Sequence, residues 1–513
     1  MNAKVWSSAR ILAACAVLSA LFAVLVRKLV YSPISYDEEY FLWNGWSVLR
    51  GGVPYRDFAE AKPPMIFFAN AAALAVGGLT EQRFRWMFAA FALAGVIAVL
   101  VSALRAGGRA LVVTPLVAGV TAAFLQQTFH DSSLDESEVI GTTFMFLAFA
   151  AMLGRETRLR LWLGGALFGL AVLSKEPFLF GVLGAMLTFF LRGNVDRARA
   201  RCFFGWVVLG GATVGVSMFV FLIAAGSLER YIVTLRMYAL LASDYAYEIG
   251  RMQRGTFWSE ATQTFTYLQN GLVTLPILGV VAPIVVCMAL AWRGNARAFA
   301  AAVAAFAGGV YAVTLGHCFW NHYFVMVVPG LMLMALVAAI AVSKRFETAR
   351  PRARHALAVV VAVLALAPRS EEIAAQASTT FAPWGPPYGP ELVSLIQSTT
   401  SVDDTILTLG PPGMYVFADR QGALPFNTFV DEVLNVEPGA TDDEKLAELR
   451  TILAQKMPKM IFTSSPIGPR ANRYLNGLFL PHIQRFEYRE LSPNTYVLDA
   501  QLPTLRAGKG SVP

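Results

Sequence analysis

The sequence predicts a polytopic α-helical membrane protein with a C-terminal α/β domain. Of its 513 residues, 56% are hydrophobic and only 15% are charged. A soluble protein of this length would carry closer to a quarter of charged residues. Apolar stretches of about 20 residues, the length that crosses a bilayer as a helix, recur along the chain. The segment 369–513 has none and alternates helical and strand patterns instead.

About eleven crossings are predicted. The first follows Lys4 and Arg10, and no small-residue cleavage site follows its apolar run, so we interpret it as an uncleaved span and not a signal peptide. The predicted spans are 11–30, 86–104, 110–129, 138–153, 161–174, 178–191, 202–225, 272–292, 298–316, 323–343 and 356–368.

The stretch 65–79 is apolar but only about 15 residues long, which is typical of an interfacial helix. We therefore place it inside a first outer loop that spans about 32–85. The loops on the opposite side of the membrane, together with the N-terminus, carry 18 Lys and Arg against 3 Asp and Glu. Basic loops of this kind stay in the cytoplasm.

This charge pattern predicts a multi-pass membrane protein with a cytoplasmic N-terminus. The net charge of +8 reflects topology, so we expect no nucleic-acid partner. Residues 1–368 then form the membrane domain, and residues 369–513 form a periplasmic or extracellular domain. None of the four cysteines lies in that second segment, so we expect no disulfide to hold it.

The soluble segment reads as a small α/β domain, because helical and strand patterns alternate along it. Thr441 and Glu444 fit a capping box at the start of one helix. The predicted helices are "ELVSLIQS" and "TDDEKLAELRTILAQ", and the predicted strands are "TILTLG", "KMIFTS", "HIQRFEYRE" and "NTYVLDA".

Ionisable groups collect on the predicted outer face. Such groups are costly at membrane depth and are usually functional or paired. A carboxylate in a cleft can take a proton from a hydroxyl, and lysine or arginine can hold a phosphate. The candidates are Asp37, Glu38, Lys62, Arg83, Asp135, Glu136, Glu138, Lys175 and His322.

Each candidate also has a plainer interpretation. Asp37 and Glu38 could cap a helix or form surface ion pairs, and Lys62 could extend to lipid headgroups. Arg83 could anchor the chain at the interface, and Lys175 could pair with Glu176 in an ordinary turn. The acids before span 138–153 could favour a helix N-terminus, and the late histidines could be structural.

The order of the motifs resembles the polytopic glycosyltransferases of the GT-C superfamily, in the bacterial branch related to protein O-mannosyltransferases and lipid A aminoarabinose transferases. The matching segments cover most of residues 30–335. They are "YDEEY", "LRGGVPYRDFAEAKPPM", "EQRFRW", "SEVIGTTFMFLAFAAML", "GLAVLSKEPFLFG" and "HYFVMVVPGLMLMA".

The resemblance implies transfer of a sugar from a polyprenyl-phosphate donor at the outer leaflet, usually with inversion. Asp37 falls at the family's catalytic acidic position and Glu38 completes the acidic pair. Lys62 falls at the "KPP" position near the donor phosphate, and Arg83 at the arginine that closes the first outer loop. Tyr55 lies in the same matched segment, near the substrate.

The later motifs complete the implied site. Asp135 or Glu138 matches a second acidic position, with Glu136 between them. Lys175 matches a donor-side lysine, although glutamate and proline follow it here. His322 and Tyr323 match an "HY" pair before a late span. Some distant relatives bind a divalent metal through acids of both loops and others need none, so metal use stays open.

The sequence therefore predicts a lipid-phosphate-sugar-dependent glycosyltransferase. Its acceptor would be lipid A, lipopolysaccharide core, another envelope glycan or a protein. The alternative from another class is a lipid or glycan transporter or flippase, in which the charges would line a pathway. No internal repeat is found and the charges gather at one face, which favours the enzyme. A third alternative is an inactive relative.

Overall fold

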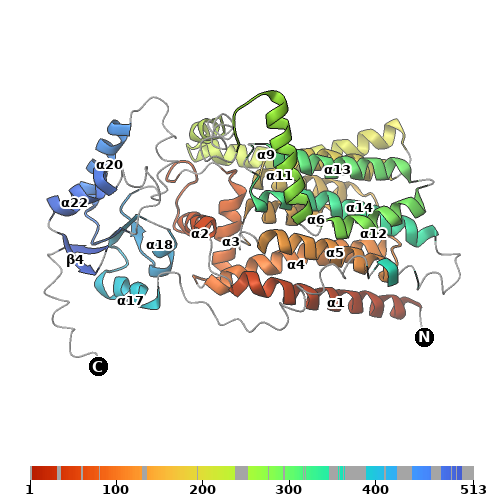
Figure 1. Cartoon of the computed structure of the whole chain (residues 1–513), viewed down its shortest axis with the longest axis horizontal. Coiled ribbons are helices and arrows are strands. Elements are labelled where there is room, and N and C mark those ends of the chain that lie inside the picture. The colour runs from red at the N-terminus through yellow and green to blue at the C-terminus, as the bar shows by residue number, and fades with distance from the viewer. Residues whose placement is uncertain are drawn as a thin grey trace.

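The structure, a computed structural model, shows a helical bundle joined to a C-terminal α/β unit (Figure 1). It describes residues 3–31, 36–58, 62–79, 81–129, 134, 136–192, 195–236, 252–274, 277–292, 295–315, 317, 319–345, 356, 359–361, 363, 389–409, 412–424, 442–463, 475–486, 488–492 and 494–498.

Each predicted span from 11–30 to 323–343 overlaps a described helix. These helices are α1 (Ala3–Tyr31), α4 (Glu81–Arg105), α5 (Ala110–Phe129), α6 (Ser137–Met152), α7 (Arg158–Ser174), α8 (Phe178–Leu191), α9 (Arg197–Ala224), α12 (Ile277–Ala291), α13 (Ala296–Thr314) and α14 (Val328–Arg345). Between α9 and α12 lies α11 (Phe257–Thr274).

Five of the described helices are long and apolar enough to cross a membrane. They cover 8–31, 83–105, 197–224, 296–314 and 321–345. The predicted span 356–368 lies mostly outside the described residues, so the count of eleven crossings stays a prediction.

The centre of the bundle is α14, which continues from the 3-10 turn η1 (Asn321–Val327). The apolar stretch of these two elements is buried along its whole length, in contact with α5, α12 and α13. Gly330 permits this packing, because a Cβ there would lie 2.4 Å from the Cα of Phe306. The central helix therefore fixes η1, which carries His322.

Two short helices, α2 (Tyr36–Leu49) and α3 (Met65–Gly77), form the described part of the first outer loop. With 13 residues, α3 is too short to cross a bilayer, as its apolar stretch predicts. The sequence predicts interfacial helices in this loop but gives bounds only for the one over 65–79, so the bounds of α2 were not predicted. Its first turn holds three carboxylates, which favour the positive end of the helix dipole.

Both helices lie at the end of the bundle that faces the C-terminal unit, whereas the N-terminus lies at the far end (Figure 1). They cross closely at Gly45, where a Cβ would lie 2.6 Å from the Cβ of Asn70. The small residue at this crossing sets how near α2 comes to α3, and so where the acids of α2 can reach.

The C-terminal unit is a five-stranded mixed sheet with helices. Its elements are α17 (Gly389–Thr399), β1 (Thr405–Leu409), α18 (Gly413–Ala418), β2 (Gln421–Gly422), α20 (Asp442–Lys456), β3 (Met460–Thr463), η3 (Leu475–Phe479), α22 (Leu480–Arg485), β4 (Tyr488–Ser492) and β5 (Thr495–Leu498). The strand order is β2-β1-β3-β5-β4. The strands β2, β1 and β3 are parallel, and β5 pairs antiparallel with both β3 and β4.

Most elements predicted for this segment agree with α17, β1, α20, β3 and β5. The strand predicted over "HIQRFEYRE" is partly wrong, because its first half belongs to helix α22 and only the end belongs to β4. Pro481, in the first turn of α22, favours a helix start. Thr441 and the boundary at 368 lie outside the described residues, so the capping box and the domain division stay predictions.

The far side of the sheet has its own small core, which includes Leu453, Ile461 and Phe479. His482 of α22 is buried there, and its ring contacts Phe486 and Tyr488 at centroid distances of 4.6 and 5.6 Å. Burial, together with the nearby charge of Arg485, lowers the pKa of His482 to about 4.

This histidine makes the C-terminal unit acid-sensitive. Its pKa in the folded state lies below the unfolded value of about 6.5, so its stabilising effect is present above pH 6.5 and is lost as the pH falls toward 4. We expect a loss of about 2 kcal/mol between pH 7 and pH 4.5, seen as faster amide exchange in β4 and β5. His482→Phe should flatten this dependence. An unchanged pH profile in that variant would contradict the assignment.

Candidate functional site

A buried ion pair organises the end of the bundle where the predicted site residues lie. Glu38 of α2 pairs with Arg85 of α4, and both side chains are fully buried. The backbone N–H of Leu134 donates to Glu38 Oε1 at 3.0 Å. Arg85 also donates to the carbonyl oxygen of Leu29, at 3.1 Å. This pair therefore ties together α1, α2, α4 and the segment that precedes α6.

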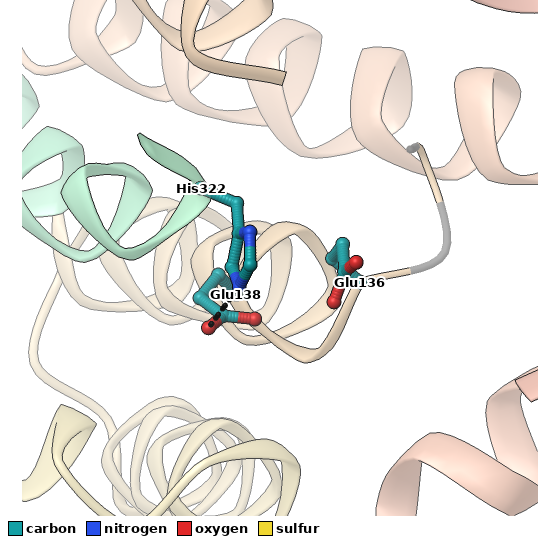
Figure 2. A group of neighbouring side chains, drawn as sticks. All are labelled: Glu136, Glu138 and His322. Carbon is teal, nitrogen blue, oxygen red and sulfur yellow. Dashed lines mark ion pairs between the residues drawn. The ribbon is translucent and has the colours of Figure 1, made fainter. Parts of the chain in front are cut away.

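The second acidic position forms a compact group with residues from three elements. Glu138, in the first turn of α6, pairs with Lys175, which ends α7. His322 Nε2 of η1 lies 3.9 Å from Glu138 Oε1 (Figure 2). Ser137 Oγ donates to the other carboxylate oxygen of Glu138 at 2.7 Å. Figure 2 shows the imidazole and this carboxylate pointing toward each other.

Local contacts hold these elements in register. Thr142 of α6 donates a hydrogen bond to the carbonyl oxygen of Val325 in η1, at 3.3 Å. The ammonium of Lys175 lies 3.8 Å from the ring centroid of Tyr323, which is a cation–π contact. These contacts form one cluster, made of Glu138, Lys175, His322 and Tyr323. All four are candidate site residues of the sequence.

Glu136 lies directly ahead of α6, beside this cluster (Figure 2). It is buried, and among the described residues its Oε2 has no hydrogen-bond partner. The pKa of Glu136 is raised to about 7, chiefly by burial; the charges of Asp37 and Glu138 add to this rise, and those of His322 and Lys62 oppose it. Asp37 and Lys62 of the first loop therefore lie close enough to act on the second acidic position.

Asp37 and Lys62 themselves are half-buried. Lys62 Nζ lies 4.1 Å from the ring centroid of Phe41, one turn beyond Asp37 on α2. Tyr55 is buried, and its hydroxyl donates to the carbonyl oxygen of Lys62 at 2.5 Å. Tyr55 therefore fixes the backbone that presents the lysine.

The remaining candidates are Arg83 and Asp135. Arg83 is exposed, whereas Arg85, two residues on, is the arginine that reaches an acid. Asp135 lies outside the described residues. Lys175 pairs with Glu138, so the plainer interpretation, a pair with Glu176, is wrong.

Sequence reasoning missed the roles of Phe41 and Ser137. Phe41 is an apolar residue among many, and only the fold places its ring under Lys62. Ser137 has a local signal that could have been used, since it adjoins Glu138 at a helix start, where hydroxyls commonly bond to neighbours.

The residues of this cluster fit a divalent cation. Ligand atoms of Glu136, Glu138 and His322 all lie within 4.8 Å of one another. Two carboxylates and an imidazole are a donor set that zinc and other divalent metals accept. Oε2 of Glu136 has no hydrogen-bond partner in the described part of the chain and could serve as a ligand, although Lys175 already neutralises part of the charge of Glu138.

Comparison with solved structures identifies the fold. Over 94% of its length the chain is similar to ArnT from Cupriavidus metallidurans in the apo state, with a TM-score of 0.59, 13% identity and 98% of that chain covered. It is also similar to the Archaeoglobus fulgidus oligosaccharyltransferase solved with Zn and sulfate, with a TM-score of 0.52, 15% identity, and 92% of this chain and 71% of that chain covered. No protein-family model and no curated protein sequence matches.

Both similar proteins are glycosyltransferases with the GT-C fold. The chain therefore has the GT-C fold, and the resemblance noted in its sequence motifs is confirmed at the level of the fold.

The buried ion pair gives a test of this arrangement. Removing one partner leaves the other charge buried and unpaired, so Glu38→Gln and Arg85→Met should each destabilise the protein by roughly 3 kcal/mol. The double variant should be more stable than the sum of the two changes predicts, because neither charge remains. Thermal unfolding in detergent measures all three. Strictly additive losses would show that the pair does not act as a unit.

Proposed function

We propose that the protein is a membrane glycosyltransferase that moves a sugar from a polyprenyl-phosphate donor to a hydroxyl of an envelope acceptor. The observation that carries this proposal is the cluster of buried acids, lysines and histidine at one end of a GT-C bundle. Helix α2, whose Glu38 accepts a hydrogen bond from Leu134 just ahead of the cluster, lies at the end of the bundle that faces the C-terminal unit, and the N-terminus lies at the other end (Figure 1). We assign the cluster's end to the periplasmic face of the inner membrane and the N-terminus to the cytoplasm.

Two lysines are suited to hold the donor phosphate. Lys62 and Lys175 each lie over an aromatic ring, which keeps the charge near apolar surface, and Lys175 is also paired with Glu138. Charge-assisted hydrogen bonds from lysine to phosphate are among the stronger ones in proteins. Arg83, exposed at the start of α4, would contact the donor or lipid headgroups at the rim.

An apolar groove of about 250 Å³ between α7, α8 and α9 suits the lipid part of such a donor. Its walls include Leu173 and Leu179, which flank Lys175 in the chain. Glycines 165, 169 and 211 line the groove where α7 and α9 pack closely, since a Cβ on Gly165 would lie 1.9 Å from the carbonyl oxygen of Val207. An isoprenoid chain in this groove would lead up to the lysine, so phosphate and lipid would meet suitable surfaces together.

The proposed reaction uses Asp37 as general base. The acceptor hydroxyl gives its proton to Asp37, and its oxygen attacks the anomeric carbon. The bond between that carbon and the phosphate oxygen breaks, and its electron pair leaves with polyprenyl phosphate. Lys62 and Lys175 stabilise the departing charge. Attack opposite the leaving group inverts the anomeric centre.

The other acids have supporting roles in this proposal. Glu38 holds the start of α2 through Arg85 and does not reach the substrate. Glu136, Glu138 and His322 would hold a divalent cation, which would supply a Lewis acid for the donor phosphate. Tyr55 orients Lys62 through a hydrogen bond to its carbonyl oxygen, and Tyr323 orients Lys175 through its ring.

Two substitutions test the base and the phosphate site. Asp37→Asn should lower transfer to an envelope acceptor by about a hundredfold or more, because the general base is lost. Lys62→Ala should lower it by about tenfold or more, because one phosphate contact is lost. The assay follows labelled sugar from polyprenyl phosphate into acceptor in proteoliposomes.

Exposed matched controls are Asp403→Asn and Lys456→Ala in the C-terminal unit, both expected at wild-type rates. Wild-type transfer by the two site variants would sink the proposed mechanism. Counterflow of labelled donor without any glycosidic product would instead favour a transporter.

Metal binding is tested separately. Purified protein dialysed against zinc or manganese should retain about one ion per chain by elemental analysis. His322→Ala should weaken retention by roughly tenfold or more, since it removes one of three ligands. His317→Ala, in the same loop but outside the cluster, is the control. Equal retention in both variants would exclude the Glu136, Glu138 and His322 site.

A further inference from the structure

The C-terminal unit contacts α2, the helix that carries the proposed base, through its own short helix α18. Glu39 follows Asp37 and Glu38 on α2 and is almost completely buried. Its Oε2 accepts a hydrogen bond from the backbone N–H of Gly413 at 3.1 Å. Gly413 begins α18, so a carboxylate of the first loop is held at the N-terminus of a helix from the C-terminal unit.

A side chain at position 413 would displace the carboxylate from this contact. A Cβ added to Gly413 would lie 2.8 Å from Oε2 and 3.1 Å from Cδ of Glu39. Gly413 is therefore not a flexible point in this contact. Its missing side chain is what allows the carboxylate to reach the backbone.

A second ion pair fixes the other end of α2 to the same helix. Arg50, just after α2, pairs with Asp419, which ends α18 with a φ of 55°. The guanidinium of Arg50 also lies 4.4 Å from the ring centroid of Trp46. Both ends of α2 are thus held by the two ends of α18.

The two contacts Glu39–Gly413 and Arg50–Asp419, together called the clamp, are connected to the sheet of the C-terminal unit. The fully buried Tyr415 of α18 accepts a hydrogen bond from the backbone N–H of Thr408 in β1, at 3.0 Å. Its ring centroid lies 6.5 Å from that of Trp43 on α2. A shift of the sheet would therefore reach α2 through packed aromatic rings.

From these contacts we propose that Glu39 is a positioning residue, through which the C-terminal unit sets the orientation of α2 and hence of Asp37. The inference rests on the proposed function, since it assigns Asp37 as base. The three consecutive acids then act on three different groups: the charge of Asp37 acts on Glu136, Glu38 pairs with Arg85 and Glu39 accepts from Gly413. The C-terminal unit acts here as part of the catalytic framework and not as a separate binding module.

The test compares Gly413→Ala, Glu39→Ala and the double variant in the full-length protein. We expect each single variant to lower kcat by about tenfold, with less than a twofold change in the KM for the donor. The double variant should be no worse than either single one, because the clash at position 413 needs the carboxylate. Glu39→Gln keeps an acceptor oxygen and should restore most of the activity.

Amide exchange across residues 36–49 gives a readout that does not depend on activity. It should rise in Gly413→Ala and Glu39→Ala. Gly205→Ala is the control, since a Cβ there meets nothing within 4 Å.

If the wild-type protein transfers no sugar but exchange rises as expected, the proposed function fails and the clamp stands. Unchanged exchange in α2, or additive losses of kcat in the double variant, would overturn the clamp itself.

Discussion

The ion pair between Glu38 and Arg85 is the contact on which the rest of the site depends. Both charges are fully buried, so each would be costly without the other. Arg85 also donates to the carbonyl oxygen of Leu29 near the end of α1, and Glu38 accepts from the backbone of Leu134. Four segments between residues 29 and 134 therefore meet at one pair of side chains. A pair of this kind adds little net stability, but it permits only one arrangement of its partners.

The remaining acids of α2 take their directions from this fixed point. Successive residues of a helix point about 100° apart, so Asp37, Glu38 and Glu39 cannot share a partner. With Glu38 directed at Arg85, Asp37 is left half-buried near Glu136, and Glu39 reaches Gly413. The cluster of α6, α7 and η1 is built in the same way, with one acid held between a lysine and a histidine. The first loop and this cluster interact electrostatically, because the charges of Asp37 and Lys62 act on Glu136.

Hydropathy and charge predicted the helical bundle well, because the bilayer imposes a length and a composition on each helix. The order of motifs predicted the GT-C fold. Which partner each of Asp37, Glu38 and Glu39 contacts could not be predicted, because it depends on the angle at which α2 leaves the bundle. Arg83 and Arg85 illustrate the same limit. They are two positions apart, yet Arg83 is exposed and Arg85 is buried, and the sequence does not show where α4 begins. Gly413 gave no signal, since its partner lies 374 positions away.

The central claim is that this cluster binds a lipid phosphate. Native mass spectrometry of the protein with polyprenyl phosphate, in competition with phosphatidylglycerol, tests it most directly. The account predicts that each chain retains one polyprenyl phosphate in preference to the competing anionic lipid. This binding should be lost when Lys62 and Lys175 are both changed to alanine. Equal retention of the two lipids, or binding that survives the loss of both lysines, would contradict it.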